Sequence, residues 1–600
     1  MLKRQGLSFL KSGTIKLNGI VDDYVKFVEE FQLKDINLWG KFTHVFKAHE
    51  DIKDDGWRGE YWGKMMRGAC LVYYYSQDEE LYSILEKTVI DLLSKQDELG
   101  RISSYDVERE FNGWDMWGRK YVITGLLHFV DICKSDILKN NIIDALCKHL
   151  DYILDKVGDK EGQRKIELTS TSWGGVNSCT ILEPVLDLYN RTQIKKYLDF
   201  AEYIIKTGGS SLGDLVKSAF ENKIIPCEYP VQKAYEVMSF FEGLLAYYEL
   251  TGDEYYLTVV NNFVEAVQKT EITVIGCAGM LGECFNNAVT KQTEIVEHPT
   301  QETCVAVTWM RLLTRLYKIT GCVEYANRIE LSGLNALFGS INVKKCICNS
   351  KSNNIMVDSI PFDSYSPLNS SSRNQGVGGF KDLQEGGYYG CCACIGSAGV
   401  AIIPLTTVMK SNEGYLINYY YELNVNDEDF AFSISGDYLK DKQVVLTVKK
   451  STSEEKEITF RVPSWCNGLE IKTKNQNIIC ENQSISKSIK KVWEKGEQVI
   501  IKFEFDITLS EMNGFKIFKY GPLVLARDNH KEFAAAGVGN VGFDLNMENL
   551  LIDRLPCKDG EMARFEVKDK KGDGRFILTD YASCGKQWDN ENQISVWLKK

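Results

Sequence analysis

Three cysteines fall within four positions of a glycine-rich stretch, EGGYYGCCACIGSAG (385–399): Cys391, Cys392 and Cys394. Adjacent thiols can both bind one metal ion, which packing alone has no reason to require. A second stretch, QETC (301–304), supplies Glu302 and Cys304, and borderline-soft Zn²⁺ accepts such a mixture of oxygen and sulfur donors. These two residues would complete a Cys3Glu site with Cys391 and Cys392, and Cys394 is expected to pack.

A second group of candidates mixes tryptophans with charged residues in GWRGEYWGK (56–64), NGWDMWGRK (112–120) and TSWGGVNS (171–178). Aromatic rings can stack on sugars while charged groups bind their hydroxyls, so these stretches favour a polar cleft. The predicted substrate-binding residues are Trp57, Arg58, Glu60, Trp62, Asp115, Trp117, Arg119 and Trp173. The alternative is that the tryptophans fill the core and the charges form buried ion pairs.

Other candidate motifs have simpler structural explanations. Cysteines that stand singly in apolar runs, such as Cys70, are typical small buried hydrophobes. Cys346 and Cys348 are expected in a loop, and His298 is expected to face solvent or cap an element. GVGNVG (537–542) lacks the strand and helix of a dinucleotide-binding unit and is interpreted as a loop.

The composition excludes several classes of partner. The chain has 600 residues, a net charge of −12, 44% hydrophobic and 26% charged residues, as in a soluble globular protein. An acidic chain disfavours nucleic acid and anionic membranes, which reward a basic surface. There is no apolar run of transmembrane length and no signal-peptide core, so we expect a cytoplasmic protein. The sequence leaves a homodimer open.

A helical repeat runs through the first two-thirds of the chain. Helical runs rich in Leu and Tyr end in polar turns at Ser76, Ser135, Thr192, Thr251 and Thr320, at spacings of 59, 57, 59 and 69 residues. Each period holds two helices, and a fixed period indicates a repeat architecture. Five pairs, with a sixth from the N-terminal helix and the segment after 395, predict an (α/α)6 barrel with one central cleft.

From about residue 414 the hydrophobic period changes to two, as in KEITFRVPSW and EQVIIKFEFDITL, which is typical of short strands. The sequence therefore predicts three parts: an (α/α)6 catalytic barrel over 1–410, a β-sandwich over 411–512 and a second β-rich segment over 513–600.

The motifs GWRGEYWGK, GECF-to-ETC, CC and YGPLVLARD resemble those of glycoside hydrolase family 127, the beta-L-arabinofuranosidase family, once a domain of unknown function. The resemblance covers nearly the whole chain, and its most specific element is the pairing of ETC with CC. It implies that Glu302, Cys304, Cys391 and Cys392 hold zinc, that Cys391 is the nucleophile, and that Glu283 of LGECF is the general acid/base.

Two departures from the family pattern stand out. The family often has two residues and Asn after CC, whereas Ala393, Cys394 and Ile395 follow here. Matching Cys394 to the nucleophile would put Ile395 on a ligand position, so Cys391 is preferred. The stretches WGRKY (117–121), GVNSC (175–179) and QKAYE (232–236) also lack the family's sugar-binding histidines. The reaction class is therefore better supported than arabinose as the substrate.

The leading hypothesis is a zinc-dependent retaining exo-glycosidase that acts on oligosaccharides, with a Cys391 thiolate nucleophile and Glu283 as acid/base. One alternative keeps the barrel but makes it an unsaturated-glycan hydrolase or polysaccharide lyase. The other is a non-catalytic carbohydrate-binding protein with a structural zinc.

Overall fold

The computed structural model describes residues 6–296, 300–342, 348–350, 355–357, 362–373, 381–383, 387–481, 485–532, 537–558, 560–586 and 591–600. His298, Cys346 and the side chain of Cys348 lie outside the described residues, so the expectations about them stay predictions.

Six helices form a closed inner ring in which each helix packs against the next and the last packs against the first. They are α3 Tyr61–Ser76, α5 Asp115–Ile132, α8 Leu182–Thr192, α11 Ala234–Thr251, α14 Thr303–Thr320 and α17 Cys391–Thr407. The predicted polar turns lie at or just after the ends of five of them. The sixth, α17, begins at Cys391, so the three clustered cysteines of the glycine-rich stretch lie in the first turn of a helix.

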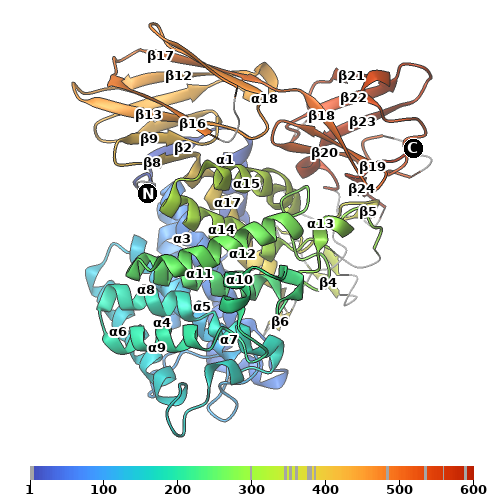
Figure 1. Ribbon diagram of the computed structural model, residues 1–600. Helices are drawn as coiled ribbons and strands as arrows, with labels where there is room; N and C mark the ends of the chain where they lie inside the picture. Colours follow the sequence, from blue (N-terminus) through green and yellow to red (C-terminus); the bar gives the residue numbers. More distant parts are fainter. Residues whose placement is uncertain are drawn as a thin grey trace.

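Further helices lie outside this ring, and from α2 onward the long outer and inner helices alternate along the chain (Figure 1). The outer helices are α1 Ile20–Val28, α2 Ile36–Ala48, α4 Glu79–Leu93, α6 Asp136–Lys156, α9 Lys195–Lys206, α12 Glu254–Thr270 and α15 Val323–Leu331. Short helices are α7 Val176–Cys179, α10 Leu215–Glu221, α13 Ala288–Lys291, α16 Phe338–Ser340 and α18 Tyr438–Asp441. The arrangement confirms the predicted helical toroid.

Local sequence explains why the helices stop and restart at the turns. Helix α11 ends at Gly252, whose φ of 71° is a left-handed conformation that glycine adopts without strain. The next residue, Asp253, accepts a hydrogen bond from the backbone of Tyr255 and so caps the start of α12. Asp78 and Ser135 cap α4 and α6 in the same way.

Two antiparallel-rich sheets follow the barrel. One has the order β1 Ser8–Phe9, β8 Val408–Lys410, β9 Gly414–Ile417, β13 Glu455–Val462 and β16 Ile485–Val492. The other has the order β15 Asn477–Cys480, β14 Gly468–Lys472, β17 Gln498–Glu504, β12 Gln443–Lys450, β11 Ala431–Ser435, β10 Leu423–Asn426 and β2 Ile15–Leu17. The N-terminal strands β1 and β2 thus pair with strands about 400 residues later in the chain.

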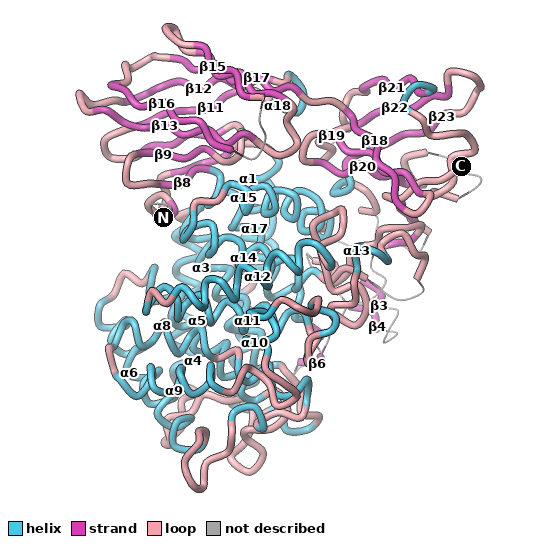
Figure 2. The backbone as a smooth tube through the Cα atoms, in the orientation of Figure 1, coloured by secondary structure: helices cyan, strands magenta, loops and turns pink. Residues whose placement is uncertain are grey.

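The last part of the chain forms a third sheet, which Figure 2 shows beside the first two. Its order is β18 Ile507–Met512, β19 Phe515–Tyr520, β20 Leu523–Asp528, β23 Arg575–Asp580, β22 Arg564–Asp569 and β21 Leu550–Arg554. Strand β24 Gln593–Ser595 joins β20 to β5 Ser371–Ser372, and two small hairpins are β3 Cys348–Ser350 with β4 Ile355–Val357 and β6 Lys381–Leu383 with β7 Gly387–Tyr389. The expected boundaries at 410 and 512 stay predictions.

The first two sheets pack on the carboxyl-terminal ends of the inner helices. The hydroxyl of Tyr75, near the end of α3, accepts a hydrogen bond from the backbone of Leu17 at 2.9 Å. Tyr317, near the end of α14, donates to Asn418 at 2.5 Å. The amino-terminal ends of the inner helices therefore lie at the opposite end of the barrel. Among the described residues, no helix is both long and apolar enough to cross a membrane.

Candidate active site

Four donor side chains meet at the amino-terminal ends of two inner helices. Glu302 and Cys304 begin α14, and Cys391 and Cys392 are the first two residues of α17. The Cys304 sulfur lies 3.3 Å from that of Cys391 and 3.1 Å from that of Cys392. All four residues are buried, and their donor atoms lie within 4.8 Å of one another. The structure brings the four predicted ligands together.

The donor set fits a tetrahedral zinc ion. With Zn–S bonds of about 2.3 Å, tetrahedral sulfurs lie about 3.8 Å apart. The Cys391 and Cys392 sulfurs are separated by 3.9 Å, close to this value, whereas the Cys304 sulfur lies nearer to both, at 3.3 Å and 3.1 Å. The Glu302 Oε1 atom lies 3.5 Å from the Cys392 sulfur. The other oxygen of Glu302 is buried and has no hydrogen-bond partner among the described residues. A buried carboxylate with one unpaired oxygen beside three thiols is a donor set that could hold a metal ion.

Cys391 differs electrostatically from its neighbours. Its pKa lies well below the usual thiol value, because the Cys304 and Cys392 thiols donate hydrogen bonds to its sulfur and because Lys64 and Lys233 carry positive charge nearby. Its position at the first residue of α17 also favours a negative charge. Burial instead raises the pKa values of Cys304 and Cys392. Of the three thiols, Cys391 is the one most readily deprotonated.

Glu283 lies on the loop between α12 and α13, in a left-handed conformation with φ of 62°. Its carboxylate forms an ion pair with Lys233, the residue before α11. Gly279, on the same loop, lies near both acids, since a Cβ atom there would make ordinary contacts, 3.6 Å from the Cα of Glu283 and 3.5 Å from the Cβ of Glu302. Burial raises the pKa of Glu302, and the negative charge of the nearby Glu283 adds to that rise.

Glu60 and Lys64 form a second polar group beside the cysteines. The Lys64 ammonium lies 3.1 Å from the Glu60 carboxylate, which also accepts a hydrogen bond from the Trp117 indole. Burial raises the pKa of Glu60 to about 7, Lys64 opposes that rise and Cys391 adds to it. Glu60 therefore lies close enough to Cys391 for their charges to interact, and Trp117 bonds to Glu60.

The other predicted sugar-binding residues divide into two sets. Trp173 is 38% exposed and lies 5.5 Å from the Lys233 ammonium, at the mouth of the site. Trp57 is partly buried and packs edge-on against Trp114. A sugar-binding role for these two residues stays a prediction.

The second set is held within the protein. Trp62 is fully buried, and its indole donates to Thr88. Arg58 forms ion pairs with Asp51 and Asp382.

Asp115 and Arg119 belong to one buried ion-pair network. The Arg119 Nε atom lies 3.0 Å from Asp115, and its Nη2 atom lies 2.8 Å from Glu110. Like Trp62 and Arg58, this pair is buried within the barrel, and a sugar-binding role for it stays a prediction.

Sequence reasoning did not single out three residues that border the site: Lys64, Lys233 and Tyr365. The two lysines lie at the starts of inner helices, in the stretches GWRGEYWGK and QKAYE. Because the starts of the inner helices are expected to surround one cleft, their position in the repeat predicts that they border it. Tyr365 lies beside Glu302 in a short backbone bridge, and burial together with the charges of Glu302 and Glu283 raises its pKa. No local signal marked Tyr365.

Cys394 lies one turn into α17 and is fully buried. Burial raises its pKa well above the usual thiol value, and it is not among the four clustered donors. This position agrees with the expectation that it packs.

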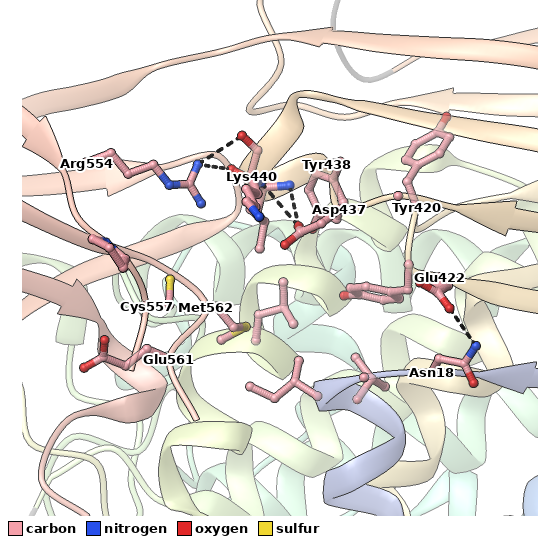
Figure 3. A pocket seen from close by; sticks show the side chains of 18 of the residues that line it. Asn18, Tyr420, Glu422, Asp437, Tyr438, Lys440, Arg554, Cys557, Glu561 and Met562 are labelled. Atoms are coloured by element: carbon pink, nitrogen blue, oxygen red, sulfur yellow. Dashed lines mark hydrogen bonds between the residues drawn. The ribbon is translucent and has the colours of Figure 1, made fainter. Parts of the chain in front are cut away.

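A large cavity lies elsewhere, at the junction of the barrel with both β-rich parts (Figure 3). Its volume is about 960 Å³, and its lining includes Asn18, Tyr438, Lys440, Arg554 and Met562. None of the four clustered donors lines it, so it is separate from the candidate active site.

Comparisons with known proteins agree with the arrangement. A family described as beta-L-arabinofuranosidase, GH127 catalytic domain, matches residues 23–348, and the corresponding GH127 middle domain matches residues 416–505. No curated protein matches the chain.

Solved structures share the fold over the full length. A GH127 beta-arabinofuranosidase is 16% identical, with a TM-score of 0.73 over 99% of this chain and 98% of its own. A GH127 beta-L-arabinofuranosidase from Geobacillus stearothermophilus T6 is 15% identical, with a TM-score of 0.72 over 98% of this chain and 99% of its own.

Proposed function

The chain belongs to glycoside hydrolase family 127, and from that premise we propose that it is a zinc-dependent retaining exo-glycoside hydrolase. The proposed substrate is an oligosaccharide from which a terminal L-arabinofuranose, or a related unusual sugar, is released. The observation that carries the proposal is the convergence of Glu302, Cys304, Cys391 and Cys392 next to Glu283.

The four clustered residues would hold the zinc ion. Bound zinc would keep its thiol ligands deprotonated at neutral pH, where a free thiol is mostly protonated. Cys391 is the proposed nucleophile because its sulfur already has the lowest pKa of the three and is 8% exposed, while Cys304 and Cys392 are fully buried. The remaining three ligands act as holding groups.

The reaction then follows a double displacement. The Cys391 sulfur forms a bond to the anomeric carbon while the glycosidic bond breaks, and Glu283 gives its proton to the departing oxygen. Glu283 next takes a proton from the attacking water, which forms the new bond to the anomeric carbon and releases the thiolate. Lys233, paired with the Glu283 carboxylate, is the proposed positioning residue for this exchange.

The sugar would lie between Cys391 and the loop that carries Glu283. Trp173 offers an exposed ring at the mouth, and Tyr365 offers a hydroxyl near Glu302 and Glu283. No histidine lies in the three stretches that match the family's sugar-binding positions. We therefore propose that this chain recognises sugar hydroxyls with residues of its own, including Lys233 and Glu60.

A screen of aryl L- and D-furanosides and pyranosides, with zinc content measured on the same samples, tests the proposal. We expect about one zinc per chain, turnover of at least one furanoside, and loss of turnover when a chelator removes the metal. Cys392→Ser should lower the zinc content, whereas the matched change Cys394→Ser should not. Full turnover by metal-free protein would contradict the proposal.

A further inference from the structure

A layer of buried polar side chains crosses the barrel below the metal cluster. Five inner helices contribute one side chain each, at the sixth or seventh residue: Arg67 from α3, Lys120 from α5, Ser239 from α11, Thr308 from α14 and Ser397 from α17. Since the inner helices begin at one end of the barrel, these residues lie at about one level, roughly 8 Å below the helix starts. The contact of Ser397 with Gly68, next to Arg67, supports this common level.

None of these side chains has a hydrogen-bond partner among the described residues. All three nitrogens of Arg67, the ammonium of Lys120, and the hydroxyls of Ser239, Thr308 and Ser397 are buried and unpaired. Each residue is at most 1% exposed. Buried donors are almost always paired in native proteins, because an unpaired one keeps the cost of its lost hydration. The layer thus holds two cationic donors and three hydroxyls that no described residue pairs, and the nearby Glu183 Oε2 atom is likewise buried and unpaired.

The two cations of the layer and Lys64, which lies outside it, surround one ring. The ammonium groups of Lys120 and Lys64 lie 5.0 Å and 5.2 Å from the centre of the Tyr121 ring, and the Arg67 guanidinium lies 5.6 Å from it. Of these three cations only Lys64 has a bonded carboxylate, that of Glu60. Arg67 and Lys120 therefore have no directly bonded counter-ion among the described residues.

The nearest other carboxylates are engaged with other arginines. Glu242 accepts from Arg311 at 2.9 Å, and Glu183 accepts from Arg315 at 3.0 Å. Both carboxylates lie close enough to raise the pKa of Lys120, but burial outweighs them and brings that pKa down to about 7. Arg67 and Lys120 are therefore buried cations that no described carboxylate bonds directly, although the charges of Glu183 and Glu242 lie near Lys120.

We propose that this layer is a binding site for one small inorganic monoanion, with chloride as its occupant, held between Arg67 and Lys120 and bonded by the neighbouring hydroxyls. A single negative charge matches the site, because Glu183 and Glu242 already offset part of the positive charge. A weakly hydrated halide also loses less on entering an enclosed position than a strongly hydrated, multiply charged anion does.

Bromide diffraction tests the site directly in the unmodified protein. Crystals grown without halide and soaked in sodium bromide should give an anomalous peak within about 3.5 Å of both Arg67 and Lys120. Bromide peaks on the surface together with none in this layer would overturn the proposal, as would ordinary water density there.

Thermal unfolding in solution gives an independent measurement. At constant ionic strength, replacing gluconate by chloride should raise the Tm saturably, by roughly 2 °C. The rise should be lost in Arg67→Met and in Lys120→Met, either of which suffices if the other does not fold. It should persist in Arg461→Met, since Arg461 is also fully buried but bonds to Asn327 and Glu330 far from this layer. A wild-type Tm that is the same in chloride and in gluconate would overturn the proposal.

Discussion

At the scale of single residues, Cys391 and Cys394 have the same side chain but different surroundings. Cys391 lies at the start of α17 among three other donors, and the neighbouring thiols lower its pKa. Cys394 lies one turn deeper, and burial raises its pKa. Residue type alone could not separate their roles, but their environments do.

Replacing Cys391 by Ala should lower kcat/KM by at least about a thousandfold, since the account makes it the nucleophile. Cys394→Ala is the matched control and should change kcat/KM by only a few-fold. Steady-state kinetics on both variants, with circular dichroism to confirm folding, checks the expectation. Equal losses in the two variants would contradict it.

Glu29 provides a residue-scale test that is remote from the site. Burial, and repulsion from Asp78, raise the pKa of Glu29 to about 7 in the folded protein. Because the folded pKa of Glu29 lies above its unfolded value, the contribution of Glu29 to the free energy of unfolding is fully present below about pH 4.5. This contribution is lost as the pH rises toward 7.

The variant Glu29→Gln cannot ionise, so its Tm relative to wild type should rise between pH 5 and pH 8. The largest expected change in the free energy of unfolding of the variant relative to wild type is roughly 3 kcal/mol. Melting curves at the two pH values measure the difference, and a Tm difference that is the same at both would refute the assignment.

At the scale of elements, the helix repeat could be predicted because its stop signals are local, as in the Gly252 and Asp253 pair. The approach of α3 to α5 could not, since it depends on residues about 60 positions apart. A Cβ atom on Gly63 would lie 1.8 Å from the carbonyl oxygen of Tyr121, whereas one on Gly40 in α2 would meet nothing within 4 Å.

Gly63→Ala should therefore destabilise the protein by several kcal/mol or prevent folding, because two backbones would have to separate. Gly40→Ala, the matched change in a helix with open space, should stabilise the protein by about 0.5–1 kcal/mol. Thermal unfolding of both variants tests the pair, and a neutral Gly63→Ala would show that the helices are not in close contact.

At the scale of the whole molecule, the β-rich parts and the candidate site are at opposite ends of the inner helices. The ligand cluster could be predicted from the ETC and CC motifs, because adjacent cysteines indicate a metal site. Tyr365 could not, since it reaches the site only through a long-range bridge to Glu302. The pairing of β1 and β2 with later strands was missed for the same reason.

Arg461 joins the sheets to the barrel, because it bonds to Asn327 and Glu330 of α15. Arg461→Met would leave the buried Glu330 carboxylate without its cation, at a cost of about 3–5 kcal/mol. The Tm should fall, while kcat at a permissive temperature stays close to wild type, because the site is at the other end of the barrel. A large fall in kcat would contradict this separation.

The central claim is that Cys391 forms a covalent bond to the sugar. In Glu283→Gln, an aryl furanoside with a good leaving group should still react, but the second step lacks its base and the intermediate should accumulate. Peptide mass spectrometry should then find the mass of one glycosyl group on Cys391, and none when Cys391→Ala is added. A glycosyl group on another residue, or none during a measured burst of released aryl alcohol, would contradict the account.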